Sequence, residues 1–350
     1  MDVHAILSCV KRGGGSLVLA TIVNAEGHSY RKAAACLLFR DDGERLGSIS
    51  PGCLESDLQL RVADILTRGK FEIVEYDMRS TEDFSWGEAV GCGGKIRVLL
   101  EPVEGFLRDI LCEIHDRTSN GESLRLHRWL ERGAVRYRLV FGHNSRKSAV
   151  MYGDGGRPLL IETEYSPRQR LIIFGAGLDA QPIASLAGRL GFQVAVADWR
   201  EDLCTNERFP GAQLAVGQAD DAVRSLRIGR KDYVLVCSHH FRRDKQWLEA
   251  VIPMAPAYIG IIGSQSRIRS LLDGIERPPS LHAPAGLPIG ADGPEQIAVS
   301  IVAELIQIAR RDAPETWRGE IRNVGGRYLF GGGTEQADGD AEAVSGAVFG

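Results

Sequence analysis

The sequence lacks several features that would assign it quickly to a class of protein. No apolar run approaches the roughly 20 residues that span a bilayer, and residues 1–12 have no long apolar core of the kind found in a signal peptide. The formal net charge is −4, so the chain has no basic excess that would bind nucleic acid or an anionic membrane surface. We therefore expect a cytoplasmic protein that contacts neither nucleic acid nor membrane.

Paired cysteines are also missing. The chain has seven cysteines without a CxxC pair, which argues against a zinc ribbon and against a thioredoxin motif. In a reducing compartment such scattered cysteines are free thiols. We expect most of them to be core residues, with Cys53 and Cys92 as the exceptions.

What is present is the composition of a globular protein, with 44% hydrophobic and 25% charged residues in a chain of 350. That length suits about two domains. We predict the α/β class, with an N-terminal α+β domain at 1–103, a connecting segment with strands at 104–168, and a Rossmann-like, doubly wound parallel sheet at 169–312. Residues 331–350 are acidic and glycine-rich without a basic residue, which predicts a disordered tail.

Hydrophobic periodicity predicts the elements of each part. In the first domain we expect helices at 3–10 and 53–68, and strands at 16–23, 34–40, 45–50, 71–77 and 95–101. In the connecting segment we expect a helix at 103–120 and strands at 123–129, 135–141 and 148–152. In the last domain we expect strands at 170–174, 193–197, 234–237 and 258–262. Residues 292–295 have capping-box spacing before a helix that extends to about 311.

A glycine-rich turn follows the strand at 170–174. Gly175, Gly177 and Ala180 form the pattern G-x-G-x-x-A, in which the glycines permit a tight turn and close approach of a pyrophosphate. Asp198 ends the next strand, at the position where an acidic residue bonds a ribose hydroxyl. The turn is compatible with NAD(P), with a nucleotide or pterin phosphate held without hydride chemistry, or with a purely structural role.

A dehydrogenase also needs a proton-relay residue beside the nicotinamide. His239, His240 and Asp244 are the candidates near a predicted strand end. The other interpretation of this run is a polar loop.

Two cysteines stand in unusual surroundings. Cys53 follows Pro51 and Gly52 at the predicted start of a helix, where a thiolate is favoured, although Glu55 in the same turn opposes it. Cys92 lies between glycines, on backbone that can approach a ligand closely. The alternative is an incidental thiol in each place. The two cysteines could also pair, or contact one soft metal or sulfur-rich ligand together.

Taken in order, the motifs resemble the XdhC/CoxI family of molybdenum-cofactor maturation proteins, which includes the PucA-type xanthine dehydrogenase accessory proteins. In the first half the matching stretches are 20–23, 27–31, 47–55 and 91–94. In the second half they are 174–177, 197–200, 258–264, 286–291 and 294–301. The family usually has Thr-His-Asp-His where this chain has Ser238, His239, His240 and Phe241, so the resemblance assigns that loop no role.

The resemblance implies a chaperone rather than an enzyme. Such a protein would bind molybdopterin or the molybdenum cofactor, support its sulfuration, and help its insertion into a xanthine dehydrogenase-type enzyme. A cysteine desulfurase would be a second partner, and a homodimer is expected. The implied cofactor-binding residues are Cys53, Glu55, Gly91, Cys92, Gly93, Gly94, Gly175, Gly177, Ala180, Asp198, Arg200, Gly263, Ser264 and Glu295, with Cys53 and Cys92 as possible contacts of the molybdenum.

Other functions stay open at this point. An NAD(P)-dependent oxidoreductase, or one of the subunits of a xanthine dehydrogenase, would use the turn at Gly175 for a dinucleotide. A scaffolding protein would need no ligand at either glycine-rich site.

Overall fold

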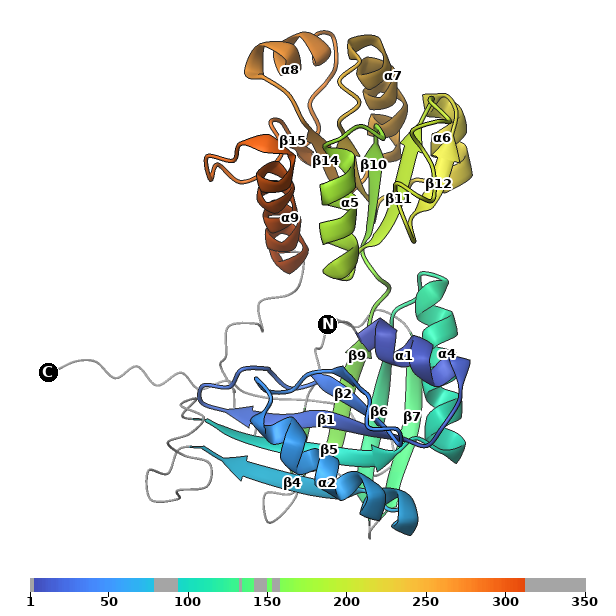
Figure 1. The fold of residues 1–350 in the computed structure, drawn as a ribbon, viewed down its shortest axis with the longest axis vertical. Coiled ribbons are helices and arrows are strands. Elements are labelled where there is room, and N and C mark those ends of the chain that lie inside the picture. The colour runs from blue at the N-terminus through green and yellow to red at the C-terminus, as the bar shows by residue number, and fades with distance from the viewer. Residues whose placement is uncertain (1–2, 79–93, 132–133, 142–149, 153–157, 312–350) are drawn as a thin grey trace, which may run out of the picture. The chain divides into compact units, whose positions relative to one another are not determined.

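The computed structural model describes residues 3–78, 94–131, 134–141, 150–152 and 158–311. Gly91, Cys92 and Gly93, and the tail at 331–350, lie outside these ranges, so the predictions made for them stay predictions. The described strands form an antiparallel five-stranded sheet, an antiparallel four-stranded sheet and a parallel six-stranded sheet (Figure 1). A mixed α/β fold was predicted, and it is confirmed.

The five-stranded sheet has the order β3-β2-β1-β5-β4. Its central strand β1 is buried over its first eight residues, because helices cover both of its faces. Helix α2 packs on one face, and helices α1 and α4 pack on the other. The elements are α1 (Val3–Arg12), β1 (Leu17–Glu26), β2 (Cys36–Arg40), β3 (Arg45–Gly47), α2 (Cys53–Arg68), β4 (Glu72–Asp77) and β5 (Lys95–Pro102).

The predicted connecting segment contains α4 (Gly105–Ser119) and a sheet of order β7-β6-β9-β8. Its strands are β6 (Leu124–Glu131), β7 (Ala134–Phe141), β8 (Val150–Tyr152) and β9 (Pro158–Tyr165). Strand β9 was not expected, since the segment opens with a proline and mixes apolar with acidic residues. Leu124 and Tyr165 belong to the same apolar cluster as Ile6 of α1, so these strands share a core with the first elements. The boundaries at 103 and 168 stay a prediction.

The third sheet is parallel throughout, with the order β12-β11-β10-β13-β14-β15. This is the doubly wound order, in which the first and fourth strands lie side by side and the strand order reverses between them. The switch point therefore lies between β10 and β13. The strands are β10 (Arg170–Phe174), β11 (Gln193–Asp198), β12 (Gln213–Val216), β13 (Tyr233–Val236), β14 (Tyr258–Ile261) and β15 (Leu281–His282).

Helices cover both faces of this sheet, as its buried strands require. One apolar cluster unites the sheet with α5 (Ala180–Arg189) and α9 (Gly293–Arg311). A second unites it with α6 (Ala219–Leu226), α7 (Phe241–Val251) and α8 (Gln265–Leu271). At the start of α9 the N–H of Asp292 donates to Gln296 Oε1 at 2.9 Å. The side chain that accepts from the N-cap N–H is therefore that of Gln296, whereas the capping-box spacing predicts Glu295.

Candidate functional site

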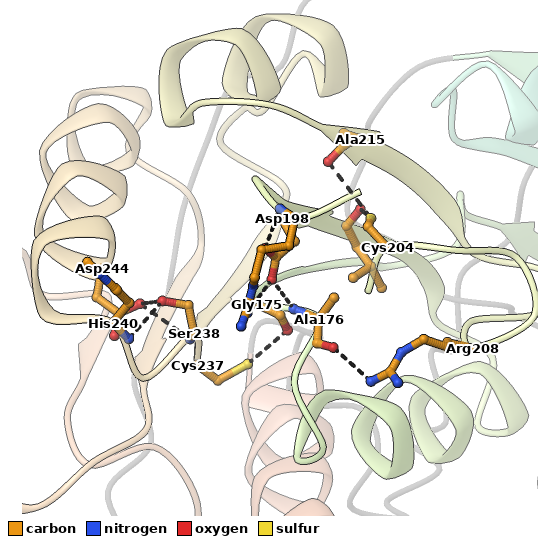
Figure 2. Close-up of polar contacts among 12 residues, drawn as sticks. Gly175, Ala176, Asp198, Cys204, Arg208, Ala215, Cys237, Ser238, His240 and Asp244 are labelled. Carbon is orange, nitrogen blue, oxygen red and sulfur yellow. Dashed lines mark hydrogen bonds and ion pairs between the residues drawn. The ribbon is translucent and has the colours of Figure 1, made fainter. Parts of the chain in front are cut away.

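The carboxyl ends of parallel strands meet at one edge of the third sheet, where ligands of this fold bind. The glycine turn follows β10, Asp198 ends β11, and the loop from Cys237 to His240 follows β13, with Asp244 in the first turn of α7 (Figure 2). The glycine turn, Asp198 and the histidine run are thus brought to one edge by three neighbouring strands.

Gly175 is required by the packing of the protein itself. Its φ is +111°, and a Cβ atom added there would lie 2.5 Å from the backbone of Ser238. Ala180 is fully buried in the cluster beneath α5, which accounts for the small third residue of the motif. These two positions therefore serve the tight contact of turn, helix and strand.

Gly177 differs, because a Cβ atom there would meet nothing within 4 Å. The residue stands just before α5, whose first N–H groups carry the positive end of the helix dipole. The space beside Gly177 is therefore open, next to the helix start where a phosphate binds in folds of this kind.

Asp198 is fully buried, and protein donors surround its carboxylate. It accepts a hydrogen bond from the N–H of Ala176 at 2.6 Å (Figure 2). It also accepts from Arg200, whose N–H and Nη2 both lie at 2.8 Å. Burial raises the pKa of Asp198, but the bonds from Arg200 and Ala176 outweigh it and leave the pKa below its usual range. The carboxylate expected to face a ribose hydroxyl thus positions the glycine turn.

Sequence reasoning missed Arg208, whose Nη2 donates to the carbonyl of Ala176 at 3.1 Å (Figure 2). It lies in the long segment between β11 and β12, and no motif spacing links it to the turn. Arg200 places its guanidinium 4.4 Å from the ring centre of Trp199. The charge of Arg200 is paired with the Asp198 carboxylate, whereas Arg208 donates to a backbone carbonyl.

The loop after β13 is held by a buried carboxylate. Asp244 is fully buried, and it accepts from the hydroxyl of Ser238 and from Arg267 Nη2, the latter at 2.6 Å. The N–H of His240 donates to Ser238 Oγ at 3.2 Å. Asp244 is therefore a structural anchor of the loop rather than a free proton carrier.

The remaining predicted residues of the second half lie at element starts. Ser264 caps α8, where its hydroxyl accepts from the N–H of Arg267 at 3.3 Å. Gly263 has a φ of +155° and precedes that cap. Glu295 is exposed in the first turn of α9. None of the contacts among the described residues joins Glu295 to the glycine turn.

In the first half, Cys53 begins α2 and is exposed, after a glycine with a φ of +139°. Glu55, by contrast, is buried and turns back to the preceding loop. It accepts from the N–H groups of Ile49 and Ser50, at 2.9 and 2.7 Å, and from the Ser50 hydroxyl. Burial raises the pKa of Glu55, but these bonds prevail and lower it. Glu55 thus shapes the loop that presents Cys53.

Gly94 lies in a tight space, because an added Cβ would be 2.1 Å from the carbonyl oxygen of His28. The carbonyl of Gly94 accepts from the N–H of Met78 at 2.8 Å. Met78 also lines a small pocket with Ser50 and Leu54, the neighbours of Cys53. The described residues that flank Cys92 in sequence thus lie near the start of α2. Cys92 itself lies outside the described ranges.

The other cysteines behave as the sequence predicts. Cys9, Cys36, Cys204 and Cys237 are buried and Cys112 is partly buried, all as free thiols. Within the described part of the chain, no group of three or more His, Cys, Asp or Glu side chains is placed to hold a metal ion. No helix among those residues is long and apolar enough to cross a membrane.

Comparison with known proteins gives two family matches and several relatives. Residues 10–77 match the model of the XdhC and CoxI family, and residues 171–305 match that of the XdhC Rossmann domain. A protein of Bacillus subtilis, named as a probable subunit of xanthine dehydrogenase, is 34% identical over 324 residues, which cover 89% of this chain and 98% of the relative. The molybdenum cofactor insertion chaperone PaoD of Escherichia coli is 25% identical over 84% of both chains.

A solved structure agrees with these matches. A crystal structure from Bacillus halodurans, described as that of a xanthine dehydrogenase, has a TM-score of 0.80 and 36% sequence identity, and covers 90% of this chain and 98% of that one. With both family models matched in order and a relative aligned over nearly its full length, this chain belongs to the XdhC and CoxI family.

Proposed function

We propose that this protein is a molybdenum-cofactor-binding accessory protein of a xanthine dehydrogenase-type enzyme. The observation that carries the proposal is the exposed Cys53 thiol at the start of α2, presented by a loop that buried Glu55 holds in place. The names of two relatives, one a molybdenum cofactor insertion chaperone and the other a probable part of xanthine dehydrogenase, support the same role.

The chemistry of the cargo suits the residues present. Cysteine sulfur is a preferred ligand of soft metal centres, and the Cys53 thiol is exposed. The glycine turn before α5 is a separate candidate site for a phosphate, because the N–H groups at a helix start attract anions. In this proposal the protein holds the cofactor while a cysteine desulfurase supplies sulfur, and then delivers it to the client enzyme. The acting species is a homodimer.

The cysteine argument is tested with three alanine variants. Protein purified from a host that makes molybdopterin is denatured, and the released ligand is measured by mass spectrometry. We expect Cys53→Ala and Cys92→Ala to lower the amount of ligand about tenfold or more, since each removes a soft contact. Cys112→Ala, which changes a partly buried thiol of α4, is the matched control and should retain the ligand. Equal ligand in all variants would remove the thiols from the proposal.

A second candidate, an NAD(P)-dependent oxidoreductase or part of a dehydrogenase, is favoured by the strand order β12-β11-β10-β13-β14-β15 with the fingerprint at the switch point. The engagement of Asp198 by Ala176 and Arg200 weighs against it, because that carboxylate has few free lone pairs for a ribose. Calorimetric titration with NADH tests it. Binding that is lost in Gly177→Val supports this candidate, and the absence of binding at millimolar cofactor excludes it.

A further inference from the structure

Strand β7 ends the four-stranded sheet with an open edge. It lies at one end of the order β7-β6-β9-β8, so among the described strands only β6 pairs with it. The N–H and C=O groups on the outer edge of such a strand form a template on which another extended chain can add. The side chains of β7 indicate which kind of chain would add, because they alternate between the two faces of the sheet.

One face of β7 is apolar and is flanked by helix α4 (Figure 1). Tyr137 and Leu139 are partly buried against the apolar cluster of α1 and α4. Phe106, at the start of α4, has its ring centre 6.4 Å from that of Tyr137 and is 64% exposed. Phe141, two positions beyond Leu139 on the same face, is 55% exposed. Two exposed aromatic rings therefore stand beside the open edge, where apolar side chains of an added strand would cover part of each ring.

The other face of β7 carries positive charge. Arg136 and Arg138 are exposed on it. Across the sheet, Arg138 lies opposite His127 of β6, which in turn lies opposite Glu162 of β9. The Glu162 carboxylate is engaged away from the edge, with Oε1 3.0 Å from Arg125 Nη1 and Oε2 3.3 Å from His127 Nε2. None of the ion pairs among the described residues includes Arg138, so this row of charges ends at the open edge in a cation.

This charge distinguishes between possible occupants of the edge. Opposite charges on directly paired residues stabilise a sheet, whereas like charges destabilise it. A two-fold pairing of β7 with the same strand of a second copy, centred on Arg136, Tyr137 or Arg138, would set arginine opposite arginine. An acidic side chain opposite Arg138 would instead continue the row with the opposite sign. The edge therefore favours a strand with acidic residues over a second copy of β7.

We propose that the outer edge of β7 binds an extended segment of a partner protein in which acidic side chains alternate with apolar ones. The backbone of that segment pairs with β7. Its apolar side chains pack beside Phe106 and Phe141, and its acidic side chains lie opposite Arg136 and Arg138. Main-chain pairing gives such a complex its affinity, and the alternating side chains give it specificity. This interaction does not depend on the proposed binding of a cofactor.

The test measures binding of a fluorescein-labelled octapeptide, in which valine and glutamate alternate, to the full chain by fluorescence anisotropy. A peptide with lysine in place of glutamate is the matched probe of opposite charge. We expect the glutamate peptide to bind about tenfold more tightly than the lysine peptide, although the net charge of −4 would by itself favour lysine. In Arg136→Glu/Arg138→Glu the preference should reverse, because the charges at the edge have changed sign. The control Arg230→Glu/Arg277→Glu changes two exposed arginines elsewhere and should keep the wild-type preference.

Backbone pairing is tested on the wild-type protein with two N-methylated forms of the glutamate peptide. Successive residues of a strand direct their N–H groups to opposite edges, so methylation of all valines blocks one edge and methylation of all glutamates blocks the other. We expect one form to lose binding and the other to retain it. A contact made only through side chains would not distinguish the two forms.

Equal affinity for the two peptides, the same effect of both methylations, or no binding of either peptide would overturn the proposal. Thermal unfolding of each variant verifies that it is folded at the temperature of the measurement. Sedimentation velocity tests the second copy, since a wild-type dimer that becomes monomeric in Arg136→Glu/Arg138→Glu would assign the edge to it instead. Residues 331–350 are acidic without a basic residue. If their deletion tightens binding of the glutamate peptide, the edge belongs to the chain's own tail and the partner strand is likewise overturned.

Discussion

Gly175 and Gly177 are two residues apart, yet an added methyl group would meet different surroundings at each. At Gly175 it would lie 2.5 Å from the Ser238 backbone, on a chain whose φ is +111°. We expect Gly175→Ala to lower the free energy of unfolding by about 3 kcal/mol or more, from the sum of overpacking and backbone strain. Urea denaturation followed by circular dichroism measures the change.

Gly177→Ala should leave the fold intact, since nothing lies within 4 Å of the new atom. Gly188→Ala in α5 is its matched control, because that glycine is also in open space. We expect Gly188→Ala to raise the free energy of unfolding by up to about 1 kcal/mol, because alanine has the higher helix propensity. A loss of stability in Gly177→Ala as large as that in Gly175→Ala would show that both glycines are structural.

The buried carboxylate of Glu55 gives a pH-dependent prediction. Its folded pKa lies below the ordinary value, so its stabilisation is present above the unfolded pKa of about 4.3 and is lost as the pH falls through the folded pKa. We expect Glu55→Gln to cost about 2 kcal/mol at pH 7, because hydrogen bonds from Ile49 and Ser50 lose a charged acceptor. The difference from the wild type should shrink below about pH 4.

Unfolding midpoints from pH 3 to pH 7 test this dependence. Glu44→Gln, which changes an exposed glutamate in the hairpin before β3, is the control and should follow the wild type within about 0.5 kcal/mol. A difference between Glu55→Gln and the wild type that stays constant over the pH range would contradict the assigned role of the carboxylate.

At the scale of elements, the buried carboxylate of Glu304 fastens helix α9 to the parallel sheet. Glu304 accepts from the hydroxyl of Tyr258 in β14 and from the N–H of Gly286, both at 2.8 Å, and lies 2.9 Å from His282 Nδ1 of β15. Burial raises the pKa of Tyr258 well above its ordinary value, so the phenol stays a neutral donor. These contacts involve two of the matching stretches in the second half, at 258–264 and 286–291.

We expect Glu304→Leu to lower the free energy of unfolding by about 3 kcal/mol, since it leaves buried donors without an acceptor. Tyr258→Phe removes one donor, keeps the ring, and should cost about 1 kcal/mol. Chemical denaturation of both variants provides the measurement. Equal costs would indicate that the Tyr258 bond alone carries the effect.

At the scale of the whole molecule, a buried ion pair connects the five-stranded and four-stranded sheets. Glu101 of β5 and Arg128 of β6 are fully buried, with Oε2 and Nε 3.0 Å apart. Tyr137 of β7 donates to Glu101 Oε1 at 2.9 Å, and Arg128 Nη1 donates to Thr163 of β9 at 3.2 Å. The pair thus ties the predicted connecting segment to the N-terminal sheet.

Arg128→Met should cost about 3–5 kcal/mol, because it leaves the Glu101 carboxylate buried without a countercharge. The double variant Glu101→Leu/Arg128→Met should recover most of that loss, since two apolar side chains replace both charges. A double-mutant cycle by denaturant unfolding measures the coupling between the two residues. Costs that simply add would show that the ion pair contributes no coupling between the sheets.

The sequence alone determined the features that depend on residues near one another along the chain. Hydrophobic spacing located α2 and the strand before the glycine turn, and the turn with its alternating elements predicted the doubly wound sheet. Strand β9 was missed, because its proline start and acidic residues hide a strand that becomes visible only when paired with β6.

Only the tertiary structure decided which groups the site residues contact. Asp198 was placed correctly at the end of β11, but its partner Ala176 lies 22 positions away. Asp179 Oδ2 lies 2.7 Å from His239 Nε2, although the two residues are 60 positions apart in the sequence. Such partners are set by the order of strands in the sheet, which brings distant segments to one edge. Local spacing therefore predicts where a side chain stands, whereas the packing of whole elements decides what it binds.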